Sequence, residues 1–315
     1  MILITENLIT QEVISSSEYR VDVLRLDLLH PEVSGNKWFK LKLNLREAEK
    51  QEKKTILTFG GAYSNHIAAT AVAAAQLGLK SIGVIRGEAQ NAQNSTLSKA
   101  SKQGMQLYFT DRETYKNKND TSFLVALKEK FGDFYLLPEG GNNNLGILGC
   151  KSIVEPFPDY DYLFCACGTG TTFAGMMLGK QKHQVLVGIN VLKGKNQLVP
   201  EVNQTLRTLH PKTEAEVMGN EALESEWLNQ SCITDHYAFS GYAGFDKTLI
   251  DFKTNFEKVH HLPLDHVYTT KLFYALLDLL MREKIRKGAS VLVVHSGGLQ
   301  GNEGFEKRYH NKLKR

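Results

Sequence analysis

Short apolar runs alternate with longer stretches of helical periodicity along most of the sequence. The runs are apolar at nearly every position, which is typical of strands covered on both faces. A repeated strand–helix order predicts an α/β fold with parallel sheets, helices on both sides and right-handed crossovers. The expected strands are Ile56–Phe59, Ser81–Ile85, Gln106–Thr110, Phe134–Leu137, Tyr162–Ala166, Val185–Asn190 and Ser290–His295. The expected helices include Asn65–Leu77, Asn94–Gln103, Thr121–Phe131 and Thr172–Lys180.

The bulk composition excludes several classes of protein. A length of 315 residues, with 42% hydrophobic and 23% charged residues, suits a globular chain with one large core or two ordinary ones. The 38 basic and 34 acidic side chains give a formal charge of only +4, which does not favour nucleic-acid binding. No apolar run approaches the roughly 20 residues that span a bilayer, so no membrane association is expected. The first ten residues lack the features of a secretory signal.

The four cysteines are Cys150, Cys165, Cys167 and Cys232. Cys165 and Cys167 are separated by one residue within an expected buried strand, which is neither a zinc-binding spacing nor a disulfide framework. The sequence therefore predicts reduced core thiols, no metal site and a cytoplasmic location.

In open parallel sheets, ligands bind beyond the carboxyl ends of the strands, so the strand-to-helix loops are where a site is expected. The loop Gly60–His66 follows an expected strand and begins an Ala-rich helix. Its glycines allow close backbone approach to a ligand, and Ser64 and Asn65 lie where the helix offers free N–H groups. The alternative for both side chains is simple N-capping, and for His66 a helix-start position without catalytic function.

The loop Cys167–Thr172 also joins an expected strand to an expected helix. Small hydroxyl residues at a helix start can hold a phosphate group through backbone N–H and side-chain O–H groups. The loop is not a Walker A motif, because no Gly-Lys-Ser/Thr ending follows. The alternative is an ordinary tight turn.

Two further segments, after the two loops above, are candidates for the site. The loop His295–Gly301 again reads as strand, glycine turn and helix, and three such loops suggest a phosphorylated ligand enclosed from several sides. Lys37 follows Gly35-Asn36 and precedes two aromatic residues, so it is a candidate for a desolvated, nucleophilic lysine. The alternative is an ordinary surface lysine.

In this order, the segments resemble those of the 1-aminocyclopropane-1-carboxylate deaminase and D-cysteine desulfhydrase family. This family belongs to the tryptophan-synthase-β-like (fold type II) pyridoxal-phosphate enzymes. Gly35–Lys37 resembles the segment of the Schiff-base lysine, and Asp265–Lys271 the segment whose tyrosine packs on the cofactor ring. Pro138–Gly141 is similar as well, whereas the region Lys195–Gln230 carries no matching motif.

The resemblance implies two open, mostly parallel twisted sheets flanked by helices. It places residues 1–44 and 146–315 in a large cofactor-binding domain and residues 45–145 in a small domain. It also implies pyridoxal 5'-phosphate as the cofactor, a small amino acid as the substrate and a homodimer, the commonest oligomer in any case.

The site residues follow from the same resemblance. The implied catalytic residues are Lys37, Ser64, Tyr268 and Tyr242, although Tyr242 could equally be a core residue. The implied cofactor contacts are Lys37, Lys40, Asn65, Gly168, Thr169, Gly170, Thr171, Thr172, Tyr268 and Thr269. The implied substrate contacts are Ser64, Asn65, His66 and Ser296.

Thr269 bears on the reaction. The resemblance implies that the cyclopropane deaminase branch has a glutamate directly after the ring tyrosine, and that its carboxylate faces the pyridine nitrogen of the cofactor. A threonine hydroxyl holds a proton there less firmly, so Thr269 and Ser296 favour the desulfhydrase side. The expected reaction is α,β-elimination from D-cysteine, giving pyruvate, ammonia and sulfide.

Three alternatives remain open on the sequence. The first is 1-aminocyclopropane-1-carboxylate deaminase, which produces 2-oxobutanoate and ammonia. The second is a relative that keeps the fold and binds the cofactor without catalysis. The third is an α/β protein that binds a nucleotide through Gly168–Thr172, although it would lack a Walker lysine.

Overall fold

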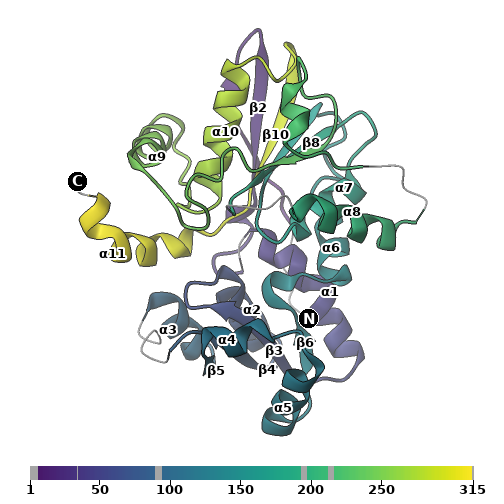
Figure 1. Ribbon diagram of the computed structural model, residues 1–315, viewed down its shortest axis with the longest axis vertical. Coiled ribbons are helices and arrows are strands. Elements are labelled where there is room, and N and C mark those ends of the chain that lie inside the picture. Colours follow the sequence, from purple (N-terminus) through teal and green to yellow (C-terminus); the bar gives the residue numbers. More distant parts are fainter. Residues whose placement is uncertain (1–5, 34, 89–93, 193–196, 212–215, 314–315) are drawn as a thin grey trace.

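The computed structural model describes residues 6–33, 35–88, 94–192, 197–211 and 216–313 (Figure 1). A six-stranded sheet has the order β1-β2-β10-β7-β8-β9, and all its strands are parallel except the edge strand β1. These strands are β1 (Thr10–Ser15), β2 (Tyr19–Arg25), β7 (Tyr162–Cys167), β8 (Val185–Asn190), β9 (Cys232–Thr234) and β10 (Ala289–His295).

A second, fully parallel sheet has the order β5-β4-β3-β6. Its strands are β3 (Thr55–Gly61), β4 (Lys80–Arg86), β5 (Met105–Thr110) and β6 (Tyr135–Leu137). Residues 55–137 thus contain the whole four-stranded sheet. In the sequence, this segment is inserted between β2 and β7 of the six-stranded sheet. The domain boundaries near residues 45 and 145 are compatible with this layout and stay a prediction.

Helices cover both faces of both sheets (Figure 1). The buried side chains of α1, α6, α7 and α8 pack on one face of the large sheet, and α10 and α9 pack on the other. The small sheet has α4 and α5 on one face and α2 and α3 on the other. The helices are α1 (Asn36–Lys50), α2 (Asn65–Gln76), α3 (Ser95–Lys102), α4 (Arg112–Lys116), α5 (Thr121–Phe131), α6 (Asn144–Lys151), α7 (Thr171–Gly179), α8 (Leu198–Leu209), α9 (Lys247–His260), α10 (Thr269–Met281) and α11 (Asn302–Leu313).

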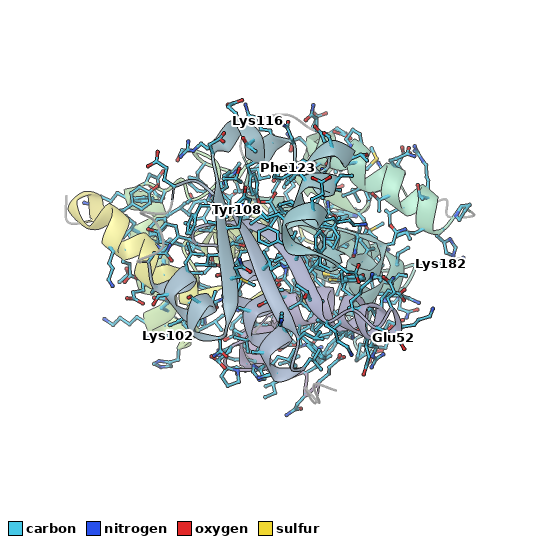
Figure 2. The ribbon with its side chains drawn as sticks, turned by 90° about the horizontal axis from the view of Figure 1, so that it is seen from below. Glu52, Lys102, Tyr108, Lys116, Phe123 and Lys182 are labelled. Atoms are coloured by element: carbon cyan, nitrogen blue, oxygen red, sulfur yellow. The ribbon has the colours of Figure 1, made fainter. Side chains whose placement is uncertain are left out.

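The small sheet is exposed at its outer end. In Figure 2, Tyr108 and Phe123 lie over the sheet, while charged side chains such as Lys102 and Lys116 point away from it at the periphery. Tyr108 and Phe123 pack against the buried cluster around Phe59.

The predicted fold class is confirmed, because all seven expected strands and all four expected helices are present within a residue or two. Strands β1, β2 and β9 were not predicted. β2 carries an aspartate and two arginines, and β9 is only three residues long, so neither reads as a continuous apolar run. In the segment 195–230, the described residues form α8 and a short 3-10 helix; residues 195, 196 and 212–215 lie outside the described residues.

Candidate active site

The carboxyl ends of β2, β3, β6, β7 and β10 all lead into the segments singled out in the sequence. Gly35 connects two of them. Its φ of 71° favours glycine, and a Cβ atom at this position would lie 2.0 Å from the carbonyl oxygen of Ser296. The start of α1 is therefore pressed against the loop after β10, where the Asn36 amide donates to the same Ser296 oxygen at 3.2 Å.

Lys37 stands in the first turn of α1, in a chain of hydrogen bonds. Its Nζ donates to Oδ1 of Asn36 at 2.8 Å, and Nδ2 of Asn36 donates to Oγ1 of Thr172 at 2.9 Å. Burial, and then the positive charge of Lys40, lower the pKa of Lys37 to about 7. A large fraction of the Lys37 amine is therefore neutral, and hence nucleophilic, at physiological pH.

Lys40 lies one turn further along α1 and is buried. Burial lowers its pKa, while the nearby thiols of Cys150 and Cys167 act in the opposite direction. Because Cys167 immediately precedes the Gly168–Thr172 loop, the Lys40 amine lies in the neighbourhood of that loop. All four cysteines are buried and free of disulfide bonds, as predicted.

The Gly168–Thr172 loop joins β7 to α7. Gly170 caps the helix with a φ of 73°, and a Cβ atom there would lie 2.7 Å from Cγ2 of Val202. The hydroxyls of Thr169 and Thr171 are 2.8 Å apart, and Thr171 donates to Oδ1 of Asn142 at 2.8 Å. Free N–H groups, a positive helix end and hydroxyls meet here, as an anion site requires.

Asn65 is one of four residues with a buried, unpartnered side-chain atom in the described part of the chain, with His66, Thr70 and Tyr115. Ser64 caps α2 by accepting from the Ile67 amide at 3.3 Å, which is the capping alternative considered above. Asn65 Oδ1 is buried without a hydrogen-bond partner among the described residues. Its amide nitrogen would lie 2.9 Å from a Cβ on Gly298, so the Asn65 amide faces the loop after β10. A buried amide oxygen without a partner calls for an explanation, and a bound group would supply one.

His66 is buried behind the cleft. Its Nε2 lies 2.9 Å from Oγ1 of Thr58, and Nδ1 has no partner in the described part of the chain. Burial, followed by the charges of Lys37 and Lys40, lowers the pKa of His66 to about 3, so the ring is neutral at physiological pH. His66 therefore acts here as a neutral polar group and not as a cation.

Tyr268 and Tyr242 are the two tyrosines of the candidate site, and Tyr268 immediately precedes α10. A Cβ on Gly168 would lie 3.2 Å from the Tyr268 hydroxyl, so this phenol reaches the start of the anion-site loop. Burial, and then the neighbouring Tyr242 and Asp265, raise the pKa of Tyr268 well above its usual value. Tyr242 is 54% exposed and packs edge-on against Tyr268, with ring centroids 6.2 Å apart. The core-packing alternative for Tyr242 is therefore wrong.

Thr269 differs from expectation. Its side chain is fully buried, its hydroxyl donates to Oδ1 of Asp265 at 2.8 Å, and the Asp265 amide donates back to it at 2.7 Å. These bonds form the start of α10, so the hydroxyl is used in holding the helix and is not presented to the cleft. Ser296, in the loop after β10, is only partly buried.

Three residues of the network were not assigned a role from the sequence: Asn36, Asn142 and Asp265. Asn36 and Thr172 are 136 positions apart, and Thr171 and Asn142 are 29 apart. The signal for Asn142 was its place after Glu139-Gly140-Gly141, and for Asn36 its place beside Lys37. Only the folded chain shows that both residues contact the anion-site loop.

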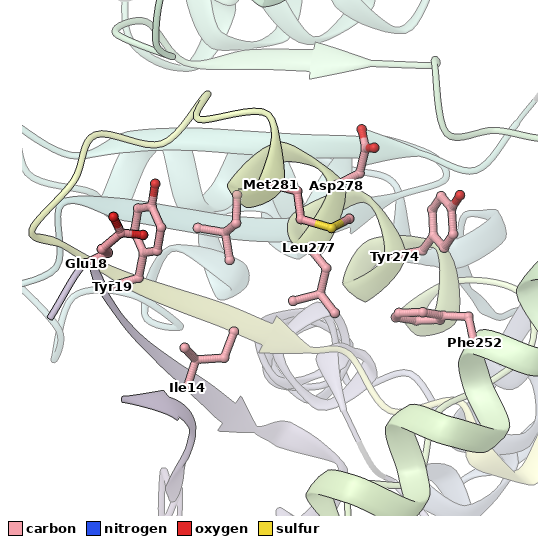
Figure 3. Close-up of a pocket in the computed structure, with 9 residues that line it drawn as sticks. Ile14, Glu18, Tyr19, Phe252, Tyr274, Leu277, Asp278 and Met281 are labelled. Atoms are coloured by element: carbon pink, nitrogen blue, oxygen red, sulfur yellow. The ribbon is translucent and has the colours of Figure 1, made fainter. Parts of the chain in front are cut away.

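A separate groove of about 450 Å³ lies away from these residues, at the opposite, amino-terminal ends of β2 and β10 (Figure 3). It is lined mainly by apolar side chains of β1, α9 and α10, including Ile14, Phe252, Leu277 and Met281. Its charged residues are Glu18, which pairs with Lys287, and Asp278, which pairs with Arg282. The groove therefore lacks the reactive groups of the cleft between the sheets.

Comparison with known proteins gives a consistent result. Residues 16–297 match the family described as pyridoxal-phosphate dependent enzymes. A Pyrococcus abyssi protein named for 1-aminocyclopropane-1-carboxylate deaminase is 31% identical, with 91% of this chain and 87% of that protein covered. The mitochondrial bifunctional D-cysteine desulfhydrase/1-aminocyclopropane-1-carboxylate deaminase of Arabidopsis thaliana is 28% identical, over 89% of this chain and 72% of its own length.

A crystal structure of an ACC deaminase homologue has the same fold, with a TM-score of 0.79 at 24% identity, over 99% of this chain and 94% of that one. Among the helices of the described residues, none has the length and apolar character needed to cross a bilayer.

Proposed function

Since the chain belongs to the family of pyridoxal-phosphate dependent enzymes, we propose that it catalyses α,β-elimination from a small amino acid with a leaving group on Cβ. D-cysteine is the first substrate to test, with pyruvate, ammonia and sulfide as products. The observation that carries this choice is that Ser296 is a partly buried hydroxyl residue, while the Thr269 hydroxyl is bonded to Asp265. The carboxylate beside Thr269, that of Asp265, is buried and accepts bonds from the amides of Val267, Tyr268 and Thr269.

The residues of the cleft fit pyridoxal 5'-phosphate. The neutral amine of Lys37 suits the aldehyde, and the Gly168–Thr172 loop with Lys40 suits the phosphate. The unpaired Asn65 amide suits the ring hydroxyl. When bound, the cofactor supplies the electron sink that stabilises negative charge at the substrate Cα.

The chain supplies position and proton transfer. We assign Lys37 as the base that takes the α-proton, because its lowered pKa leaves a neutral amine at working pH. Ser64, Asn65 and His66 lie at the positive end of α2, where the substrate carboxylate would be favoured. Tyr268 remains protonated at neutral pH, since its pKa is raised, and serves as a hydrogen-bond donor. Tyr242 is the second donor.

A hydroxyl near the ring nitrogen holds a proton less firmly than a carboxylate, so the stabilisation of charge at Cα is weaker. A thiolate leaves readily under such conditions, whereas opening an unactivated cyclopropane needs more help. Ser296 is the partly exposed hydroxyl residue here, since the Thr269 hydroxyl is already bonded to Asp265. The family match decides against the nucleotide-binding alternative.

The second candidate is 1-aminocyclopropane-1-carboxylate deaminase, which the names of the relatives favour. The deciding assay compares sulfide release from D- and L-cysteine with 2-oxobutanoate release from the cyclopropane substrate. We expect sulfide from D-cysteine and little 2-oxobutanoate. Efficient deamination of the cyclopropane without sulfide release reverses the assignment, and a yellow protein without any turnover indicates a non-catalytic cofactor-binding relative.

Two further properties belong to this proposal. Four buried, unpaired cysteines favour a cytoplasmic location. A homodimer is expected because symmetric dimers are the commonest oligomers, and light scattering after gel filtration measures it directly.

A further inference from the structure

Lys271 is a fully buried lysine outside the groups that the proposed reaction uses. It lies in the first turn of α10, three residues after Tyr268. Its Nζ donates to the carbonyl oxygens of Ala238 at 2.8 Å and Gly241 at 2.7 Å. No carboxylate forms an ion pair with it in the part of the chain that the structure describes. A buried charge paired only with carbonyls is costly, so its contacts call for an explanation.

The two carbonyls belong to the loop that carries Tyr242. This loop is wound into consecutive turns, in which the amides of Gly241 and Gly244 donate to the carbonyl oxygens of Ala238 and Gly241. Phe239 and Ala243 have φ values of 55° and 54°, in the left-handed region that side chains other than glycine disfavour. The loop thus holds backbone strain, and Tyr242 lies at its exposed tip.

Lys271 therefore connects α10 with the loop that carries Tyr242. Tyr268 begins the helix that contains Lys271, and Tyr242 follows the second carbonyl that Lys271 binds. The two phenol rings meet edge-on. A single ammonium group fixes the strained loop to the helix at the place where the two rings come together.

We propose that Lys271 is a positioning residue, which holds the Tyr242 loop against α10 so that Tyr242 stays beside Tyr268. The inference rests on the proposed function for the role of Tyr242, while the loop contact itself can be tested without it. Loss of the two hydrogen bonds would free a strained loop, and Tyr242 would leave its place.

The test uses Lys271→Met in the cofactor-loaded protein. Lys180→Met is the matched control, because Lys180 also donates to two backbone carbonyls, those of Gln181 and Gln184, far along α7 from the cleft. Hydrogen exchange of the peptide covering residues 238–244 should become about tenfold faster or more in Lys271→Met and stay unchanged in Lys180→Met. Unchanged exchange in Lys271→Met overturns the proposal.

Kinetics decide whether the effect passes through Tyr242. In the wild-type background, Lys271→Met should lower kcat at least tenfold with cofactor affinity retained. In a Tyr242→Phe background, the same change should alter kcat less than twofold, because the lost group is already absent. An equal loss in both backgrounds contradicts positioning through Tyr242. If the wild-type protein turns over no amino acid, the proposed function fails, and the exchange data alone decide the loop contact.

A second variant covers the case in which Lys271→Met does not fold. In Lys271→Ala, added methylammonium can occupy the vacated space and donate to the two carbonyls. Slow exchange of residues 238–244 should then return with rising methylammonium but not with tetramethylammonium, which has no N–H donor. Equal effects of the two salts would contradict the proposal.

Discussion

At the scale of single residues, the site depends on how burial sets the charge of its amines. Lys37, Lys40 and Lys271 all have pKa values lowered chiefly by burial. The hydrogen-bond partners of Lys37 and Lys271 indicate different roles for the two lysines. Among the described residues, Lys37 donates to the amide oxygen of Asn36, whereas Lys271 donates to two backbone carbonyls.

The first prediction concerns Lys37. Borohydride reduction of the cofactor-loaded protein, followed by peptide mapping, should place the pyridoxyl group on Lys37. In cofactor-free protein, the rate of covalent attachment should rise as pH increases through about 7 and then level off, because the neutral amine is the reactive form. Label on Lys40 or Lys42, or a half-maximal rate near pH 10, contradicts the assignment. Lys37→Ala is the control that forms no link.

A second prediction separates Ser296 from Thr269. Thr269→Val removes a donor from the buried Asp265 carboxylate, so it should lower the free energy of unfolding by about 1–3 kcal/mol. Ser296→Ala should leave that free energy nearly unchanged and lower kcat instead. Denaturant melts and steady-state kinetics of both variants measure this. A reversed pattern, with Thr269→Val stable but inactive, would restore Thr269 as the group facing the ring nitrogen.

At the scale of elements, the strand-to-helix loops contain the residues of the candidate site, and the helices that follow hold those residues in place. The first turns of α1 and α7 meet through Asn36 and Thr172, and Tyr268 before α10 lies against Gly168 before α7, so several positive helix ends lie near one another. A doubly charged phosphate group gains most from such an arrangement. The loops themselves need glycine where another segment approaches, as Gly35 shows with Ser296.

The third prediction concerns the β7–α7 loop. Thr171→Val should weaken cofactor affinity by about 1–3 kcal/mol if the Thr171 hydroxyl turns from Asn142 to donate a charge-assisted hydrogen bond to the phosphate. Gly170→Ala should be worse, because its φ of 73° and the 2.7 Å approach to Val202 oppose any side chain. Equilibrium titration with the cofactor measures both. Thr254→Val, on the exposed face of α9, is the control, and unchanged affinity in Thr171→Val would remove the phosphate from this loop.

At the scale of the whole molecule, the candidate site combines residues from the units around both sheets, which the chain connects several times. Asn65 of the small sheet's loop lies against Gly298 of the large one, and Thr171 binds Asn142. The C-terminal helix α11 adds a further link, since Gly304 packs on the ring of Tyr63. Residues of both sheet units therefore meet at the candidate site.

The fourth prediction follows from these links. Binding of a substrate analogue should rotate the small unit towards the large one, excluding water and completing the site. Crystal structures with and without the analogue, superposed on the six-stranded sheet, measure the rotation. Identical placement of the four-stranded sheet in both would show that the site is complete before substrate arrives.

Much of this arrangement could be predicted from the sequence. Continuous apolar runs such as Tyr162–Ala166 identified the parallel strands, and the glycine-rich loops after them identified the segments of the site. Lys37, Asn65 and the Gly168–Thr172 loop were expected at the site, and the structure brings them into one cleft. Their individual roles stay predictions. The strands β1, β2 and β9 were missed because their sequences are charged or very short.

The sequence by itself determined which segments are strands, which loops contain glycine and which side chains could react, because periodicity and local backbone preference are local properties. Only the tertiary structure decided how those side chains are satisfied. It occupied the Thr269 hydroxyl with Asp265, left Asn65 unpaired, exposed Tyr242 and buried Lys271 against the loop 30 and 33 positions away. Burial and hydrogen bonding depend on contacts between distant parts of the chain, and no local pattern records them.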